Sequence, residues 1–236
     1  MLTSFGYRAE GEGAEARAHW ELSARSLNEH WHPQPFFDLV RVESGRVHWT
    51  AEEGTSVILD TAFLVGPGAR LGRFRATEPV VLVGTRRPLA WQGDLPERSS
   101  PAPAPLSFEA ISRHGQLVPT TGSRAASSDV SARHRRRLHR NRFGVSAEKL
   151  SAIIAVQEFI DAGCPGSPRD SVLVESVNFA RFYDQSHFSR TFRAIVGVPP
   201  SAYVDRDSAW VEALMAISSK LSTLSRGYGD GGRETP

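Results

Sequence analysis

The segment that most constrains the fold lies between Asp184 and Gly197. Aspartate is a favoured N-cap, because its carboxylate accepts hydrogen bonds from the free amides of a first helical turn. Glycine is the favoured residue directly after the end of a helix. These two residues predict a helix over residues 185–196.

The two faces of this predicted helix differ in chemistry. Apolar residues recur at i, i+4 and i+7 and form one core-facing stripe: Phe188, Phe192 and Ile195. Donors and acceptors of long and short reach form the other face: Gln185, Ser186, Ser189, Arg190 and Arg193. Arginine pairs with guanine or phosphate, and glutamine pairs with adenine in the major groove. This face is therefore interpreted as a DNA-reading surface, with an ordinary solvated helix face as the alternative.

A longer run supports the DNA-reading interpretation. The sequence from Phe182 to Tyr203, including Gly197-Val-Pro-Pro-Ser-Ala-Tyr203, resembles the second helix-turn-helix signature of the AraC/XylS family of bacterial transcription regulators. The resemblance implies an all-α C-terminal domain over residues 108–205, with two helix-turn-helix units joined by a linker helix. It also implies a first recognition helix near residue 135.

A strongly basic segment lies at that place. Between Ser131 and Gly144 the chain has six arginines, two histidines and no acidic residue. A serine cap and a terminal glycine predict a helix, and i, i+3, i+4, i+7 spacing puts four arginines on one face: Arg133, Arg136, Arg137 and Arg140. We expect this face to bind DNA, and Leu138 and Phe143 to anchor the helix. A solvated or disordered basic segment is the alternative.

The remaining helices of the C-terminal domain are expected from the same resemblance. Residues 146–162 match the linker helix, with inward-facing positions at Leu150, Ile153, Ile154, Gln157 and Ile160. Residues 120–129 and 169–180 are expected to supply the supporting helices of the two units, the first of them short or absent.

Charge and proline content divide the chain. Residues 1–100 have 11 basic and 13 acidic side chains, whereas residues 113–149 have nine basic and two acidic ones, a local excess that attracts polyanions. Four prolines between Leu95 and Pro105 predict an extended tether. We therefore predict a sensor domain over 1–94, a linker over 95–107, the DNA-binding domain, and a C-terminal helix with a glycine-rich tail over 206–236.

The first domain has the pattern of a β-barrel or sandwich. Short apolar runs separated by glycines predict strands at residues 36–45, 46–50, 55–59 and 79–84. The run from Asp38 to Gly45, followed by Phe63-Leu-Val-Gly-Pro-Gly68, is similar to the cupin-like sensor domain of many AraC-type regulators. The predicted fold class is thus two-domain, a cupin-like β domain followed by an all-α domain.

Four residues of this domain are candidates for an effector pocket: His30, His32, Asp38 and Trp49. Cupin enzymes bind metal through a His-x-His pair, a carboxylate and a distant histidine. The sequence has no candidate for the distant histidine, so we predict no metal, no cofactor and no enzymatic activity. The alternative is a cupin-type metalloenzyme or ligand-binding module with a degenerate DNA-binding domain.

The resemblance implies operator DNA and an unknown small-molecule effector as partners, with RNA polymerase as a further candidate. It leaves open whether the regulator is an activator or a repressor. Residues 208–224 have helical apolar spacing, and we expect them to pack on the DNA-binding domain or to form a homodimer contact. The sequence has neither an apolar run long enough to span a membrane nor a signal peptide, so a cytoplasmic protein is expected.

Overall fold

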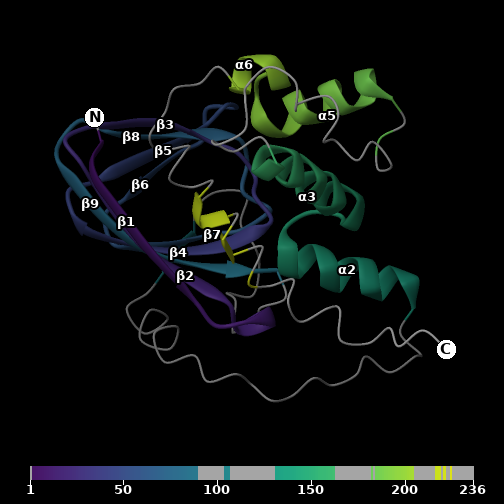
Figure 1. The fold of residues 1–236 in the computed structure, drawn as a ribbon, viewed down its shortest axis with the longest axis horizontal. Helices are drawn as coiled ribbons and strands as arrows, with labels where there is room; N and C mark the ends of the chain where they lie inside the picture. Colours follow the sequence, from purple (N-terminus) through teal and green to yellow (C-terminus); the bar gives the residue numbers. More distant parts are fainter. Residues whose placement is uncertain are drawn as a thin grey trace.

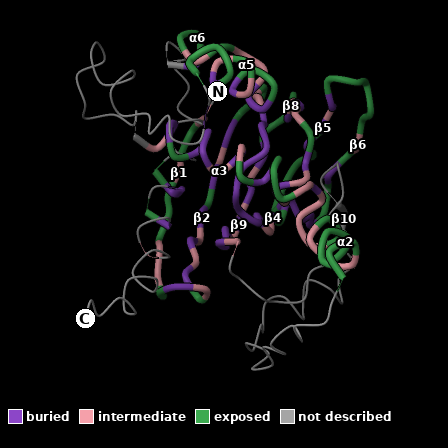
Figure 2. Tube along the Cα trace, turned by 90° about the vertical axis from the view of Figure 1, so that its right-hand side faces the viewer, coloured by how far each residue is buried: buried purple, intermediate pink, exposed green. Residues whose placement is uncertain are grey.

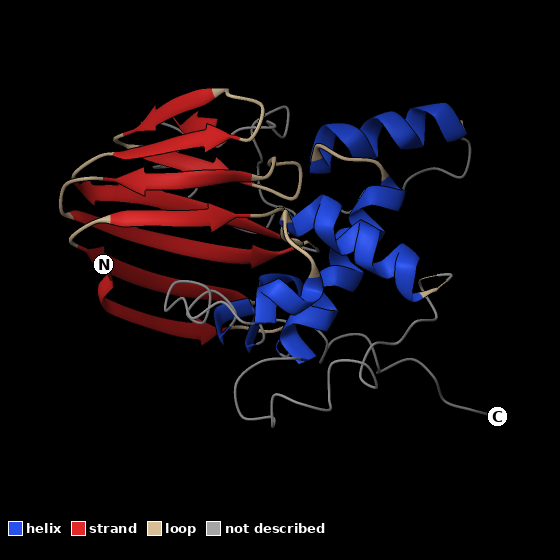
Figure 3. Cartoon of the chain, turned by 90° about the horizontal axis from the view of Figure 1, so that it is seen from above, coloured by secondary structure: helices blue, strands red, loops and turns tan. Residues whose placement is uncertain are grey.

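The chain forms a β-rich half and a helical half. The computed structural model describes residues 2–89, 104–106, 131–162, 182, 184–204, 216–218, 220–221 and 224. Strands lie on one side of the molecule and helices on the other (Figures 1 and 3). This order, β first and helices second, is the order predicted from the sequence.

A six-stranded sheet forms one layer of the β-rich half. Its strands lie in the order β1-β2-β9-β4-β7-β10, and each neighbouring pair is antiparallel. Their bounds are β1 Leu2–Glu10, β2 Arg17–Ala24, β9 Val80–Pro88, β4 Phe36–Ser44, β7 Ala62–Val65 and β10 Ala104–Leu106. A single 3₁₀ turn, Gly13–Glu15, lies between β1 and β2.

A four-stranded antiparallel sheet forms the other layer, in the order β3-β8-β5-β6. Its strands are β3 Leu27–Trp31, β8 Gly72–Ala76, β5 Val47–Ala51 and β6 Ser56–Leu59. The strands predicted on the two sides of Gly45 both form. They do not pair with each other, because β4 belongs to the first sheet and β5 to the second. Gly45 has a φ of 80° at this crossing between layers, a conformation that favours glycine.

The main core fills the space between the two sheets. Alternate residues of β2 point inward, from Ala18 to Ala24, and they meet residues from the other layer such as Trp49 and Phe74. Inward side chains are buried in both layers, which makes this half a β sandwich (Figure 2). The edge strand β10 lies within the segment predicted as a linker and pairs with β7.

One ion pair lies inside this apolar layer. Asp38 on β4 and Arg86 on β9 are direct cross-strand neighbours. The Nε and Nη2 atoms of Arg86 donate to the two carboxylate oxygens of Asp38, both at 2.8 Å. The side chains of Asp38 and Arg86 are 2% and 0% exposed, respectively. Each charge is therefore stabilised by the other in place of bulk water.

The helical half contains four described helices. They are α2 Ala132–Phe143, α3 Ala147–Ala162, α5 Gln185–Val196 and α6 Pro200–Val204. The predicted supporting helices at 120–129 and 169–180 lie outside the described residues. A helix is confirmed over the residues predicted as the linker helix. This helix, α3, begins after Ser146, whose hydroxyl accepts from the Lys149 amide.

Helix α3 is buried around most of its circumference. Of its predicted inward positions, Leu150, Ile153, Gln157 and Ile160 are buried and Ile154 is half-buried. Ala155, Val156 and Phe159 are buried as well. Because α3 contacts both α2 and α5, it lies between them (Figure 1).

We predict that the buried ion pair responds to mutation far more than a surface pair on the same strand. Asp38→Asn removes the carboxylate that pairs with the buried Arg86 cation, which should lower the free energy of unfolding by about 3–5 kcal/mol. The matched control is Glu43→Gln, which removes the carboxylate paired with Arg41 at the exposed end of β4. This change should lower the free energy of unfolding by less than about 1 kcal/mol. Urea denaturation followed by tryptophan fluorescence measures the free energy of unfolding of both variants. Equal decreases would contradict the stabilising role of the buried pair.

Candidate nucleic-acid interface

Helix α2 presents its arginines to solvent from a well-defined backbone. The Ser131 hydroxyl accepts from the His134 amide at 3.3 Å, and Gly144 ends the helix in the left-handed conformation, with a φ of 73°. The predicted caps are therefore confirmed. No residue of α2 is buried, and Figure 2 draws the helix in the colours of exposed and intermediate residues.

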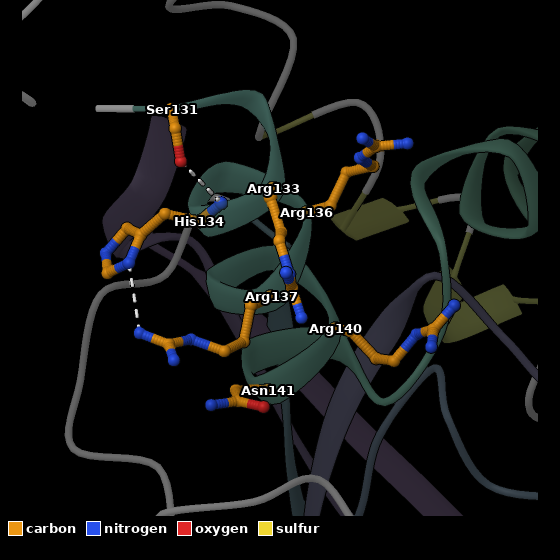
Figure 4. Close-up of a pocket in the computed structure, with 7 residues that line it drawn as sticks. All are labelled: Ser131, Arg133, His134, Arg136, Arg137, Arg140 and Asn141. Atoms are coloured by element: carbon orange, nitrogen blue, oxygen red, sulfur yellow. Dashed lines mark hydrogen bonds between the residues drawn. The ribbon is translucent and has the colours of Figure 1, made fainter. Parts of the chain in front are cut away.

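The four predicted arginines of α2 are all exposed and border one open concavity (Figure 4). That concavity is lined by Ser131, Arg133, His134, Arg136, Arg137, Arg140 and Asn141. Arg137 Nη2 donates to His134 Nδ1 at 3.0 Å, which holds these two side chains together. Among the described residues, no acidic side chain forms an ion pair with these four arginines. The concavity is therefore lined by a concentrated set of positive charges.

His134 and Asn141 join this concavity although sequence reasoning did not select them. The signal was available, because His134 lies three residues before Arg137 and Asn141 lies four residues after it, so all three share one side of a helix. Asparagine adds both a donor and an acceptor, the pair of functions that recognises adenine in the major groove.

Helix α5 has the predicted bounds and the predicted two faces. The Asp184 carboxylate accepts from the His187 amide at 2.6 Å, and Gly197 ends the helix with a φ of 87°. The residues predicted to read DNA are exposed at Gln185, Ser186, Arg190 and Arg193 and half-buried at Ser189. Arg190 Nε donates to the Ser186 carbonyl oxygen at 3.3 Å, which directs the guanidinium back towards the start of the helix.

An aromatic cluster fixes the position of α5. Phe188 and Phe192 meet the ring of Phe159 on α3 at centroid distances of 4.9 and 5.5 Å. Phe182 and Tyr203 complete the cluster. The Phe182 ring lies 5.1 Å from the Phe188 ring, and the Tyr203 ring lies 5.6 Å from the Phe192 ring. Edge-to-face contacts of this kind stabilise a pair beyond its buried area. The polar face of α5 is therefore held at a fixed orientation relative to α3.

Of the two predicted anchors of helix α2, Phe143 is confirmed and Leu138 is wrong. Leu138 was expected to face the core, and it is 52% exposed, so that expectation is wrong. The anchor is the helix end: Phe143 stacks on Phe37 of the β sandwich at 6.2 Å, and His139 Nδ1 donates to the Val145 carbonyl oxygen at 3.1 Å. Arg142 lies over the Phe143 ring at 5.4 Å, and burial lowers the pKa of its guanidinium.

The ends of α2 and α5 both contact the loop between β7 and β8. A Cβ built on Gly68 would lie 2.7 Å from the Cα of Gly144, at the end of α2. A Cβ built on Gly197, at the end of α5, would lie 2.8 Å from Leu71 Cδ2. Both candidate helices therefore end against one loop of the β sandwich, here called the β7–β8 loop, residues 66–71.

The four candidate effector residues lie in different surroundings in the described part of the chain. Asp38 lines a small cavity between the sheets together with Trp20, Trp31, Phe63 and Phe74. Trp49 is fully buried in the same core cluster.

The two candidate histidines lie elsewhere. His30 is hydrogen-bonded to Arg73 on the neighbouring strand β8. His32 packs edge-on against Tyr203 at 5.9 Å.

Sequence reasoning missed Arg86 because its role depends on strand register, which sequence patterning does not supply.

Two further findings bear on function. Among the described residues, no group of three or more histidine, cysteine, aspartate or glutamate side chains is placed to hold a metal ion. In the same part of the chain, no helix is long and apolar enough to cross a bilayer.

Comparisons with known proteins give structural neighbours for both halves. No family model matches the sequence, and no curated protein matches it either. The structure is similar to ToxT from Vibrio cholerae, an AraC-family regulator, over 86% of this chain and 98% of that one, with 10% identity and a TM-score of 0.39.

The N-terminal part is similar to cupin-fold proteins. One is an RmlC-like cupin from Shewanella frigidimarina, with 14% identity over 37% of this chain and 83% of that one and a TM-score of 0.28. Another is a putative ethanolamine utilization protein from Salmonella typhimurium, with 12% identity over 37% and 72% and the same TM-score. At such low similarity, the chain's own residues must carry the functional conclusion.

We predict that the contact between Gly68 and Gly144 controls how α2 is docked. Gly68→Ala places a methyl group against backbone atoms that have no room for it, so α2 should lose its fixed position while the sandwich stays folded. Hydrogen exchange of α2 amides should accelerate at least tenfold. The control is Gly6→Ala on β1, where an added Cβ meets no atom within 4 Å. Unchanged exchange in both variants would contradict the docking contact.

Proposed function

We propose that the chain is a sequence-specific DNA-binding transcription regulator of the AraC/XylS type. In this proposal α2 and α5 are two recognition helices that read two successive segments of the major groove of one operator. The observation that carries the proposal is that two capped helices with exposed arginine, glutamine and serine faces pack against the same central helix. Phosphate contacts fix such a protein on the duplex, and base contacts give it specificity.

The two helices are assigned different tasks. Helix α2 has six arginines and no acid, so its main contribution is attraction to phosphates and release of counterions. Helix α5 presents Gln185 and Ser186 at its N-terminal end, which is the part of a recognition helix that reaches base edges. Arg190 lies one turn further along and is suited to guanine.

A small molecule bound in the β sandwich is proposed to modulate DNA binding. Such a ligand acts by binding one of two states more tightly than the other. The β7–β8 loop supports this coupling, because it touches the ends of both helices and continues into strands that form the core. A second copy of the chain and RNA polymerase are further proposed partners, supported by the family resemblance.

We predict distinct binding signatures for the two helices. Arg140→Ala should weaken binding to every duplex alike and reduce the salt dependence by about one unit of slope. Gln185→Ala should weaken the binding free energy for the native operator by about 1–3 kcal/mol and change that for a scrambled duplex little. Fluorescence anisotropy across a salt series, with labelled duplex from upstream of the protein's own gene, measures both effects.

The control for these variants is Arg46→Ala, which removes the same charge from an exposed position of the β sandwich. It should leave both duplexes bound as before. Equal losses on native and scrambled DNA for Gln185→Ala would deny base reading by α5. Absence of any preference for the native duplex in the unmodified protein would overturn the proposed function.

A further inference from the structure

Residues near the C-terminus are part of the core of the first domain. Ile217 is 0% exposed and belongs to the core cluster between the two sheets, together with Trp20, Trp31 and Trp49. Leu221 is also fully buried, in a cluster with Ala16 and Phe36. Figure 1 draws this part of the chain in yellow, between the strands and α3. We call the described residues of this part, 216–218, 220–221 and 224, the C-terminal plug.

The C-terminal plug has the pattern of an amphipathic helix docked by one face. Ile217, Leu221 and Leu224 recur at i, i+4 and i+7 and contact the β sandwich, whereas Ala216 and Lys220 are exposed. The sequence predicted helical spacing here, but Ile217 was not selected and packing on the DNA-binding domain or on a second copy was expected. The structure places this face against the β sandwich.

A hydrogen bond ties the plug to the buried ion pair. Arg86 Nη1 donates to the Ser218 hydroxyl, while its Nε and Nη2 atoms are occupied by Asp38. Both Arg86 and Ser218 are buried. Ser218 therefore supplies an acceptor to a charged group that has no access to bulk water, and buried charges require such partners.

A cavity between the two sheets, bordered by described residues, is small. The cavity lined by Trp20, Trp31, Asp38, Phe63 and Phe74 measures about 20 Å³, which is room for about one water molecule. A small-molecule ligand needs several hundred cubic ångströms. Entry of a ligand here therefore requires that core side chains leave, and Ile217 belongs to the same apolar cluster as Trp20 and Trp31.

We propose that the C-terminal plug is an internal ligand of the β sandwich, and that a neutral amphipathic small molecule replaces it. The apolar part of this molecule takes the place of the Ile217 side chain, and a hydroxyl or carbonyl oxygen takes the place of the Ser218 hydroxyl on Arg86. A neutral head group is specified because Asp38 already neutralises Arg86. A second carboxylate beside Asp38 would be repelled in this dry interior.

The consequence for DNA binding rests on the proposed function. Twelve residues separate Val204, the end of α6, from Ile217. Docking of the plug thus tethers the helical half to the β sandwich by a second connection, besides the covalent one that precedes α2. Release of the plug removes that tether and changes how firmly the two candidate recognition helices are held.

The docking is tested by hydrogen exchange of the full chain. In the unmodified protein the peptide covering residues 216–224 should be protected, and in Ile217→Gln its exchange should accelerate at least tenfold, while α3 and α5 peptides keep their rates. The matched control is Ile58→Gln, the same change at a side chain that is 55% exposed, and it should alter nothing. If Ile217→Gln fails to fold, Ser218→Ala removes just the hydroxyl and should show the same local acceleration.

An unprotected plug in the unmodified protein, or equal protection in the Ile217 and Ile58 variants, would overturn the docking. The ligand class is tested by titrating the unmodified protein with 3-methyl-1-butanol and, separately, with isovalerate. The alcohol should accelerate exchange of residues 216–224, and isovalerate at the same concentration should not. No effect of the alcohol, or equal effects of both probes, would overturn the ligand class. Neither readout involves DNA, so failure here is distinguishable from failure of the proposed function.

Discussion

Helix α3 is the element on which the helical half depends. Leu150, Ile153, Val156, Phe159 and Ile160 are buried, so the helix must be covered on most of its sides to remove this apolar surface from water. The covering elements are the capped amphipathic helix α5, through its phenylalanine face, and the end of α2 with Val145. The burial of one apolar helix thus leaves the polar faces of its two neighbours as the surface available to a partner.

The contact between the two halves is made at helix ends. Gly68 meets Gly144, Gly197 meets Leu71, and Phe143 stacks on Phe37. The first two of these contacts involve the β7–β8 loop, so both depend on the position of that loop. A change inside the β sandwich can reach both helices through this loop, whereas the aromatic cluster on α3 keeps the internal geometry of the helical half fixed. Rigid internal packing combined with a small hinge-like contact is the arrangement expected of two-state elements.

The sequence predicted features that depend on local chemistry. The caps Ser131 and Asp184, the terminal glycines and the apolar stripe of α5 were all predicted, because capping and helical spacing are properties of a few neighbouring residues. The pairing of β4 with β9 and the position of Arg86 opposite Asp38 were not, because strand register is set by packing across the sandwich. Leu138 was misassigned because a single apolar residue on an arginine-rich helix does not reveal whether a partner covers it. The burial of Ile217 depends on contact with a distant sandwich and has no local signal.

The most direct test of the account is hydroxyl-radical footprinting of the full chain on its operator. Two recognition helices in successive major-groove segments should protect two blocks on one face of the duplex, with centres about one helical turn or 10 bp apart. Insertion of about half a turn between the two blocks should abolish protection of one of them. A single protected block, unaffected by the insertion, would contradict the claim that α2 and α5 read the same operator together.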